Sequence, residues 1–171
     1  MASIKQVKDY LVNKNPRDYM LFVLGINTGL RISNILSLQV KDVTGIHINL
    51  KEQKTRKFKK LRITPQLRRE IKWFVESKDP EEYLIKSRKG VNQPIGRSMA
   101  YKILRNVADH FGLQEIGTHT LRKTFGYHFY HQTKKTAMLQ ELFNHSSEKI
   151  ALIYIGINQD TMDKAMTKFK V

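Results

Sequence analysis

The 171-residue sequence predicts one mainly α-helical domain with a small antiparallel β-sheet, an α+β fold. Apolar residues recur at helical spacing through most of the chain, whereas two short stretches, residues 46–50 and 61–63, alternate apolar with polar residues as strands do. The length fits one domain, and a hydrophobic content of 40% is enough to build a core. Because no repeat or linker divides the chain, we assign residues 1–171 to a single domain.

Helices are expected at the start of the chain. Ser3 and Gln6 have the spacing of a capping box, which predicts a first helix. A second helix is predicted from Asn15-Pro16 to Thr28-Gly29 and is apolar on nearly all sides, so it should lie in the core. A short amphipathic helix is expected to begin at Ile32.

The two alternating stretches predict a β-hairpin. Ile46, Ile48 and Leu50 would form the apolar face of the first strand, and Leu61 and Ile63 that of the second. The segment between them is strongly basic, so positive charge is expected at the hairpin tip.

The second half of the chain is expected to be mostly helical. Thr64-Pro65 opens one helix, and residues 77–94 are polar with little periodicity. Within this segment, Tyr83-Leu84-Ile85 fits either a third strand or a packed loop, and the sequence leaves both open. Helical spacing returns over three segments, residues 98–111, 120–130 and 136–143.

The strong positive charge favours a polyanionic partner. Lysine and arginine total 31 against 15 acidic residues, a formal charge of +16. Each phosphate that such a protein neutralises releases condensed counterions, so nucleic acid is the favoured partner. A membrane surface would also attract this charge, but the basic residues are spread from Lys5 to Lys170 rather than gathered on one amphipathic helix.

Several classes of protein are disfavoured. The chain has no cysteine, which excludes disulfides and thiolate metal sites. Its longest apolar stretch, Met20 to Ile26, is far shorter than the roughly 20 residues of a spanning helix, and no signal peptide is evident, so a cytoplasmic protein is expected. Neither a nucleotide-binding loop nor a two-metal carboxylate cluster is found, so we expect no cofactor and no small-molecule substrate.

Two basic positions could bind a phosphate. His119 and Arg122 are three residues apart, which places both on one helix face, where the arginine fork fits two phosphate oxygens and the histidine can carry a proton. The alternative is a solvated helix face. Arg31 directly follows the end of the buried second helix, where we expect a positioned arginine or a surface residue at a helix start.

His145 and Tyr154 are nine residues apart. Nine steps of about 100° would place them on opposite faces of one unbroken helix. Asn144, Ser146 and Ser147 favour turns and caps, so a helix break is predicted between the two side chains. Read singly, they could also be a surface histidine and a core tyrosine.

The order and spacing of these motifs resemble the tyrosine recombinase (phage integrase) family over about Pro16 to Gly156. The resemblance implies the fold of that family's catalytic domain and site-specific cleavage and rejoining of double-stranded DNA, as in integration or recombination. A 3′-phosphotyrosine intermediate would form without metal or ATP. The motifs, in chain order, are Thr28-Gly29-Leu30-Arg31-Ile32-Ser33, the basic hairpin, His119-Thr120-Leu121-Arg122, His145-Ser146 and Ile153-Tyr154.

The resemblance also implies the role of each site residue. Arg31 and Arg122 would clamp the scissile phosphate. His119 and His145 would hydrogen-bond it, and His119 would accept the proton of the attacking tyrosine. Tyr154 would attack the phosphorus.

One further catalytic residue is expected in the hairpin. Lys54, within Gln53-Lys54-Thr55, matches the family lysine that protonates the departing 5′ oxygen. Other basic residues crowd the same segment and leave this assignment open; they are Lys51, Arg56, Lys57, Lys59 and Lys60.

The sequence departs from the family pattern at two positions. Asn34 stands where the family usually has an acidic residue, which would remove a charged partner of Arg31, although asparagine can still hydrogen-bond it. Asn144 replaces a common glycine before His145, and asparagine also tolerates the left-handed backbone that such a turn requires.

The ends of the chain raise two expectations. The N-terminal core-binding domain usual in the family is absent, which fits an excised catalytic domain or a minimal member, and weak DNA binding is expected. After Tyr154, an apolar stripe would dock on a neighbouring protomer, as in a tetramer on DNA, or fold back on its own domain. The stripe comprises Met162, Ala165, Met166 and Phe169.

Two other functions fit the same residues. A type IB topoisomerase shares much of this chemistry, but His145 and the compact size favour a recombinase. A basic nucleic-acid-binding module with an inactive site is the second alternative. The target DNA and the phage, transposon or chromosomal role stay open.

Overall fold

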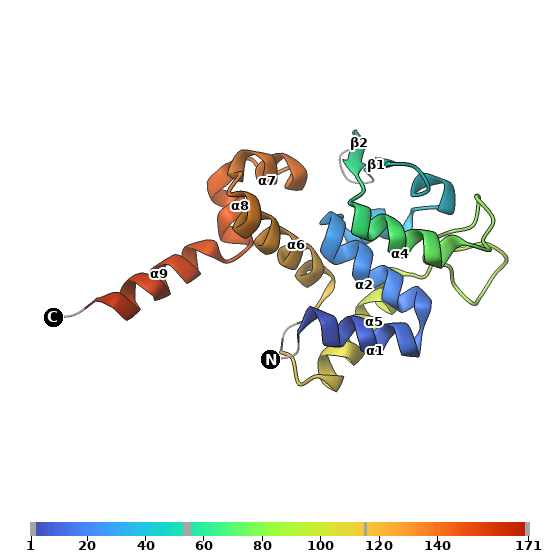
Figure 1. Ribbon diagram of the computed structural model, residues 1–171, viewed down its shortest axis with the longest axis horizontal. Helices are drawn as coiled ribbons and strands as arrows, with labels where there is room; N and C mark the ends of the chain where they lie inside the picture. Colours follow the sequence, from blue (N-terminus) through green and yellow to red (C-terminus); the bar gives the residue numbers. More distant parts are fainter. Residues whose placement is uncertain (1–2, 53–55, 115, 170–171) are drawn as a thin grey trace.

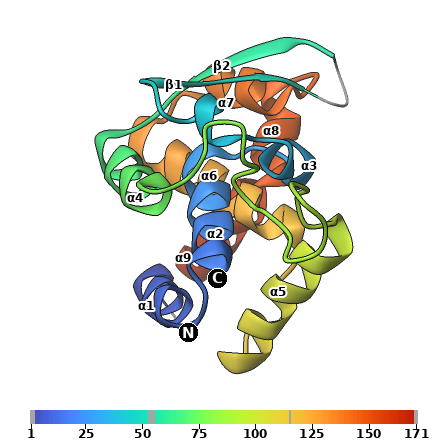
Figure 2. The ribbon, with the colours of Figure 1, turned by 90° about the vertical axis from the view of Figure 1, so that its right-hand side faces the viewer.

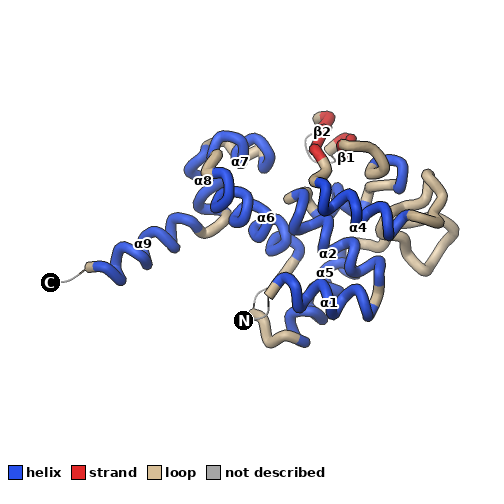
Figure 3. Tube along the Cα trace, in the orientation of Figure 1, coloured by secondary structure: helices blue, strands red, loops and turns tan. Residues whose placement is uncertain are grey.

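The computed structural model describes residues 3–52, 56–114 and 116–169, apart from four side chains in the last helix. A mainly helical fold with one small antiparallel sheet is confirmed (Figure 3). In chain order the elements are α1 (Ile4–Lys14), α2 (Pro16–Thr28), α3 (Ile32–Leu36), the short 3-10 turn η1 (Val40–Asp42), β1 (His47–Lys51), β2 (Phe58–Arg62), α4 (Pro65–Val75), α5 (Arg97–His110), α6 (Thr118–Thr133), α7 (Thr136–Phe143), α8 (Glu148–Tyr154) and α9 (Ile157–Lys168).

Helix α2 lies at the centre of the larger core, with α1, α4, α5 and α6 around it (Figures 1 and 2). Successive side chains from Met20 to Leu24 are buried, which confirms the burial predicted from an all-round apolar helix. Asn15 caps its start by accepting a hydrogen bond from the Arg17 amide, and Pro16 occupies the first helical position.

The end of α2 fixes the direction of the chain into the site. Gly29 adopts the left-handed backbone, with φ 61°, and its amide donates to the Gly25 carbonyl. The Thr28 hydroxyl donates to the Leu24 carbonyl and accepts from the Leu30 amide. These bonds hold Arg31 at the N-cap of α3, directly beyond a buried helix end.

The hairpin pairs β1 with β2 in antiparallel register, with Ile48 opposite Leu61. Ile48 and Leu50 are buried, whereas Ile46 lies before the strand and is 48% exposed, so its predicted place on the apolar face is wrong. The tip of the hairpin, including Lys54, lies outside the described residues.

The segment Tyr83-Leu84-Ile85 is a packed loop. It makes an isolated β-bridge, from Tyr83 to Gln39, rather than joining the sheet as a strand. Leu84 and Ile85 are fully buried, so the loop contributes side chains to the larger core.

Helices α7 and α8 form a second, smaller core with the C-terminal part of α6 (Figure 1). Helix α7 ends at Phe143, Asn144 takes the left-handed backbone with φ 50°, and Ser147 caps the start of α8. The predicted helix break between His145 and Tyr154 is therefore confirmed, as is the left-handed conformation of Asn144.

Helix α9 extends away from the body of the molecule (Figure 1). Met166 and Phe169 of the predicted stripe are 69% and 66% exposed, so this domain does not cover them. Among the described helices, none is both long enough and apolar enough to span a bilayer.

The close packing of α6 against the second core gives a prediction at Gly126. A Cβ there would lie 2.6 Å from Ile155 Cγ2 and 2.8 Å from the fully buried Phe143 ring. We expect Gly126→Ala to lower the free energy of unfolding by about 1–3 kcal/mol, because overpacking outweighs alanine's better helix propensity. In Gly45→Ala the new Cβ meets nothing closer than 3.8 Å, so the change should stay within about 0.5 kcal/mol. Equal chemical-denaturation midpoints for the two variants would contradict the packing.

Candidate active site

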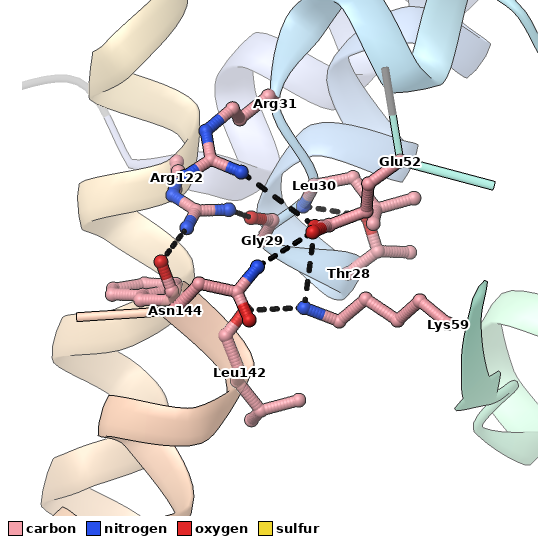
Figure 4. Close-up of polar contacts among 10 residues, drawn as sticks. Thr28, Gly29, Leu30, Arg31, Glu52, Lys59, Arg122, Leu142 and Asn144 are labelled. Atoms are coloured by element: carbon pink, nitrogen blue, oxygen red, sulfur yellow. Dashed lines mark hydrogen bonds and ion pairs between the residues drawn. The ribbon is translucent and has the colours of Figure 1, made fainter. Parts of the chain in front are cut away.

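Arg122 lies at the junction of the two cores (Figure 4). It projects from the beginning of α6 and is 4% exposed. Its Nη1 donates to the carbonyl of Gly29 beyond α2, and its Nη2 donates to the carbonyl of Phe143 at the end of α7, at 2.9 Å. The guanidinium also stacks over the Phe143 ring, at 4.2 Å from the centroid. Burial, assisted by Arg31, lowers the pKa of Arg122 to about 10, so it stays charged at neutral pH.

A cavity of about 460 Å³ opens beside this arginine. Its lining brings together three of the predicted residues, Arg31 at the start of α3 and His119 and Arg122 on α6. Because guanidinium groups bind phosphate oxygens through directed hydrogen bonds, a cavity with this lining suits a phosphate group. Ile32, Ser33, Arg97 and Thr118 complete the lining.

Arg97 was not expected at the site. It is the first residue of α5 and is exposed. Sequence reasoning missed it because nothing near Gly96-Arg97 distinguishes this arginine from the rest of the 31 lysines and arginines.

Tyr154 is the last residue of α8 and contacts both His119 and His145. Its hydroxyl lies 3.3 Å from His119 Nδ1, within hydrogen-bonding distance across two helices. Burial raises the pKa of Tyr154, whereas Arg122 and Arg31 act in the opposite direction by stabilising the phenolate. The tyrosine is therefore protonated at rest, with a histidine placed to accept its proton.

His145 packs edge-on against Tyr154, with ring centroids 5.1 Å apart and planes at 76°. It follows the left-handed turn at Asn144 and also contacts the Phe143 ring, at 5.4 Å between centroids. Burial lowers the pKa of His145, and the charges of Arg122 and Arg31 lower it further. Near neutral pH this imidazole is therefore uncharged in the free protein.

The hairpin adds a partly buried lysine to these residues. The Lys59 side chain is 15% exposed, and its Nζ donates to the carbonyl of Leu142 in α7 and lies 3.7 Å from the Glu52 carboxylate. Burial lowers the pKa of Lys59. The predicted residue Lys54 lies outside the described residues, so Arg31, His119, Arg122, His145 and Tyr154 are the expected positions that the structure brings together.

The comparisons with known proteins agree with the sequence motifs. The model of the phage integrase family matches residues 2–160. The chain belongs to this family. It is 52% identical over 170 residues to the "Probable integrase/recombinase YoeC" of Bacillus subtilis, covering 99% of this chain and 93% of that protein. A "Tyrosine recombinase" of Pseudothermotoga lettingae is 28% identical over 156 residues, covering 88% of this chain and 53% of that protein.

Solved structures share the fold of this family member. A crystal structure of XerA recombinase aligns with a TM-score of 0.75 and 17% identity, covering 99% of this chain and 64% of that one. The XerH recombinase in a post-cleavage complex with difH DNA aligns with a TM-score of 0.73 and 20% identity, covering 98% and 52%. The chain thus spans roughly half to two thirds of these structures.

In this family member, a carboxylate still faces Arg31 although residue 34 is neutral. Asn34 is buried on α3, and Glu52, directly after β1, lies 3.6 Å from Arg31 Nη1. The Asn144 side chain donates to the same carboxylate at 2.6 Å. Position 34 thus supplies no charge, as the sequence indicates, and Glu52 of the hairpin provides the acidic partner of Arg31 instead.

The charges around His145 predict its titration. We expect His145 in the free protein to titrate below its usual pKa of about 6.5, because burial and two arginines disfavour the imidazolium. Arg31→Gln removes one of these cations and should raise this pKa, whereas Arg105→Gln, whose arginine pairs with Asp109 on α5, should leave it unchanged. Histidine NMR titration measures both values, and a His145 pKa that does not respond to Arg31→Gln would contradict the arrangement.

Proposed function

We propose that this chain cleaves and rejoins double-stranded DNA at specific sites through a 3′-phosphotyrosyl intermediate, with Tyr154 as the nucleophile. One observation carries the proposal: a cavity lined by Arg31, Arg122 and His119 adjoins a tyrosine hydroxyl that lies 3.3 Å from that histidine. A nucleophile, a base and two phosphate-binding cations thus meet at one place.

The two arginines would act electrostatically. Arg31 and Arg122 bind the non-bridging oxygens of the scissile phosphate and offset the charge that grows as the phosphorus becomes pentavalent. Arg122 is already fixed by the carbonyls of Gly29 and Phe143, so little reorganisation is needed when the phosphate enters. His145 supplies a further hydrogen bond to the same phosphate.

Cleavage moves two protons. Tyr154 forms a bond from its oxygen to the phosphorus and gives its proton to His119, while the bond from phosphorus to the 5′ oxygen breaks. At pH 7 an ordinary tyrosine is ionised about one time in a thousand, a deficit of roughly 4 kcal/mol that the base and the cations must offset. Lys54 donates the proton to the leaving 5′ oxygen.

Rejoining reverses these steps. The phosphotyrosyl bond keeps the energy of the broken phosphodiester, so a 5′ hydroxyl can attack it without ATP. Exchange of strands follows when the attacking hydroxyl belongs to a second duplex. The integrase and recombinase names of the relatives support this outcome over simple relaxation of supercoils.

The proposed partners are double-stranded DNA and further copies of the chain. Relatives in solved structures include the XerH recombinase bound to difH and a lambda integrase dimer bound to a core site. The projecting helix α9, with Met166 and Phe169 exposed, supports docking on a neighbouring protomer, as in a tetramer on DNA. Residues 1–171 would serve as the catalytic domain, acting in the cytoplasm.

The test is covalent trapping. Nicked duplexes of randomised sequence lose a short oligonucleotide after cleavage, which prevents rejoining and leaves protein attached to DNA. We expect the wild-type chain to form an adduct that resists detergent, and Tyr154→Phe to lower adduct formation at least about 100-fold, because the nucleophile is lost.

Tyr10→Phe is the matched control, because that tyrosine lies on α1 and bonds Lys14 instead of a site residue. It should trap DNA as the wild type does. Equal trapping by Tyr154→Phe would refute the proposed nucleophile. Salt-dependent binding without any wild-type adduct would favour an inactive binding module.

A further inference from the structure

Glu52 is a buried carboxylate at the meeting point of the hairpin, the arginine pair and the turn before α8. It is 2% exposed and lies directly after β1. Its backbone amide donates to the Lys57 carbonyl, and its carbonyl accepts from the Arg56 amide. These two bonds join the two sides of the hairpin next to its tip. A carboxylate loses its hydration when it is buried, which is costly unless cations and donors replace the water.

Among the described residues, the side chains of Arg31, Lys59 and Asn144 replace that water (Figure 4). The Glu52 oxygen Oε1 lies 3.6 Å from Arg31 Nη1 and 3.7 Å from Lys59 Nζ, and Oε2 accepts a hydrogen bond from Asn144 Nδ2 at 2.6 Å. These partners come from α3, β2 and the turn after α7. One carboxylate therefore connects three elements that are far apart in the sequence.

We propose that Glu52 is a positioning residue, which holds Arg31 toward the phosphate cavity and, through Asn144, fixes the turn that presents His145. The inference rests on the proposed DNA cleavage. Arg31 is 24% exposed at its side chain, and Glu52 is the acidic side chain that the described structure pairs with it. A long side chain with this exposure has many rotamers, and an anion on one side restricts them.

Glu52 fixes the turn before His145 through its hydrogen bond with Asn144. Asn144 has a left-handed backbone, a conformation that non-glycine residues adopt at a cost unless other contacts hold it. Its side chain reaches Glu52, and the next residue is His145. The carboxylate thus sets the position of the first arginine and of the second histidine together.

The negative charge of Glu52 makes it possible to distinguish a positioning role from a direct effect on DNA binding. Glu52 is an anion next to a proposed phosphate site, so its direct effect on DNA binding is repulsive. Neutralising it should leave DNA affinity unchanged or slightly tighter. If Glu52 positions the catalytic groups, the same change should nevertheless slow cleavage, since misplacement by about 1 Å can cost about 100-fold in rate.

The experiment measures Glu52→Gln in the full chain with the nicked randomised duplexes. The amide oxygen of the new residue can still accept from Asn144, so the fold should survive. We expect the single-turnover rate of adduct formation at saturating DNA to fall by about 10- to 100-fold, with no loss of DNA affinity. A wild-type rate in Glu52→Gln would overturn the inference.

Glu70→Gln is the matched control. Glu70, on α4, is a paired carboxylate that is partly buried; it lies 2.6 Å from Lys8 and accepts a hydrogen bond from the Tyr19 hydroxyl. It should lose stability without losing cleavage rate. Asn144→Gly is a second variant, suited to the left-handed turn, that removes one bond to Glu52 and should slow cleavage by about 3- to 10-fold. A wild-type cleavage rate in Asn144→Gly would overturn the part of the role that acts through Asn144.

An NMR measurement keeps this inference separate from the proposed function. The Arg31 Nε–H signal should exchange faster with water in Glu52→Gln than in the wild type or in Glu70→Gln, because the guanidinium loses its anion. An unchanged Arg31 signal in a folded Glu52→Gln protein would overturn the positioning role, whether or not the chain cleaves DNA. Failure of the wild type to form any adduct, with the Arg31 signal responding, would instead refute the proposed cleavage alone.

Discussion

The burial of one charged side chain, Arg122, organises this molecule. Arg122 is 4% exposed, so the donors of its guanidinium need partners inside the protein. They are the carbonyls of Gly29 and Phe143, at the C-terminal ends of α2 and α7. Carbonyls at a helix C-terminus lack intrahelical donors and carry partial negative charge, so they suit a cation. Removing the guanidinium would leave two such carbonyls unpaired, at about 1–3 kcal/mol each. The same bonds join the larger core to the smaller one.

This constraint explains the state of the site before DNA binds. Arg31, Arg122 and Lys59 concentrate positive charge, and Glu52 offsets part of it. His145 stays neutral and Tyr154 stays protonated, because each ionised form would be either repelled or poorly solvated there. An entering phosphate supplies the missing negative charge. It would therefore favour protonation of His145, whose pKa the arginines lower in the free protein.

Local signals in the sequence predicted most elements, and the ordered motifs of the family resemblance predicted the five site positions that the structure describes. The capping pattern at Ser3, the stop at Gly29 and the break after Phe143 depend on neighbouring residues, and the structure has all three. Contacts between residues far apart in the sequence could not be predicted in this way, because no local pattern marks them. Glu52 and Asn144 are 92 positions apart, and Arg97 is one basic residue among many. The ambiguous Tyr83 to Ile85 segment is apolar enough for a strand, but its burial comes from packing as a loop. Lys54 stays a prediction.

The central claim, that Tyr154 attacks a phosphate held at the Arg122 junction, has a direct measurement. Protein trapped on a nicked duplex can be digested with nuclease and protease, and the peptide that retains a nucleotide can be sequenced by mass spectrometry. The account predicts a nucleotide attached through its 3′ phosphate to Tyr154. Attachment to another residue, or through a 5′ phosphate, would contradict it.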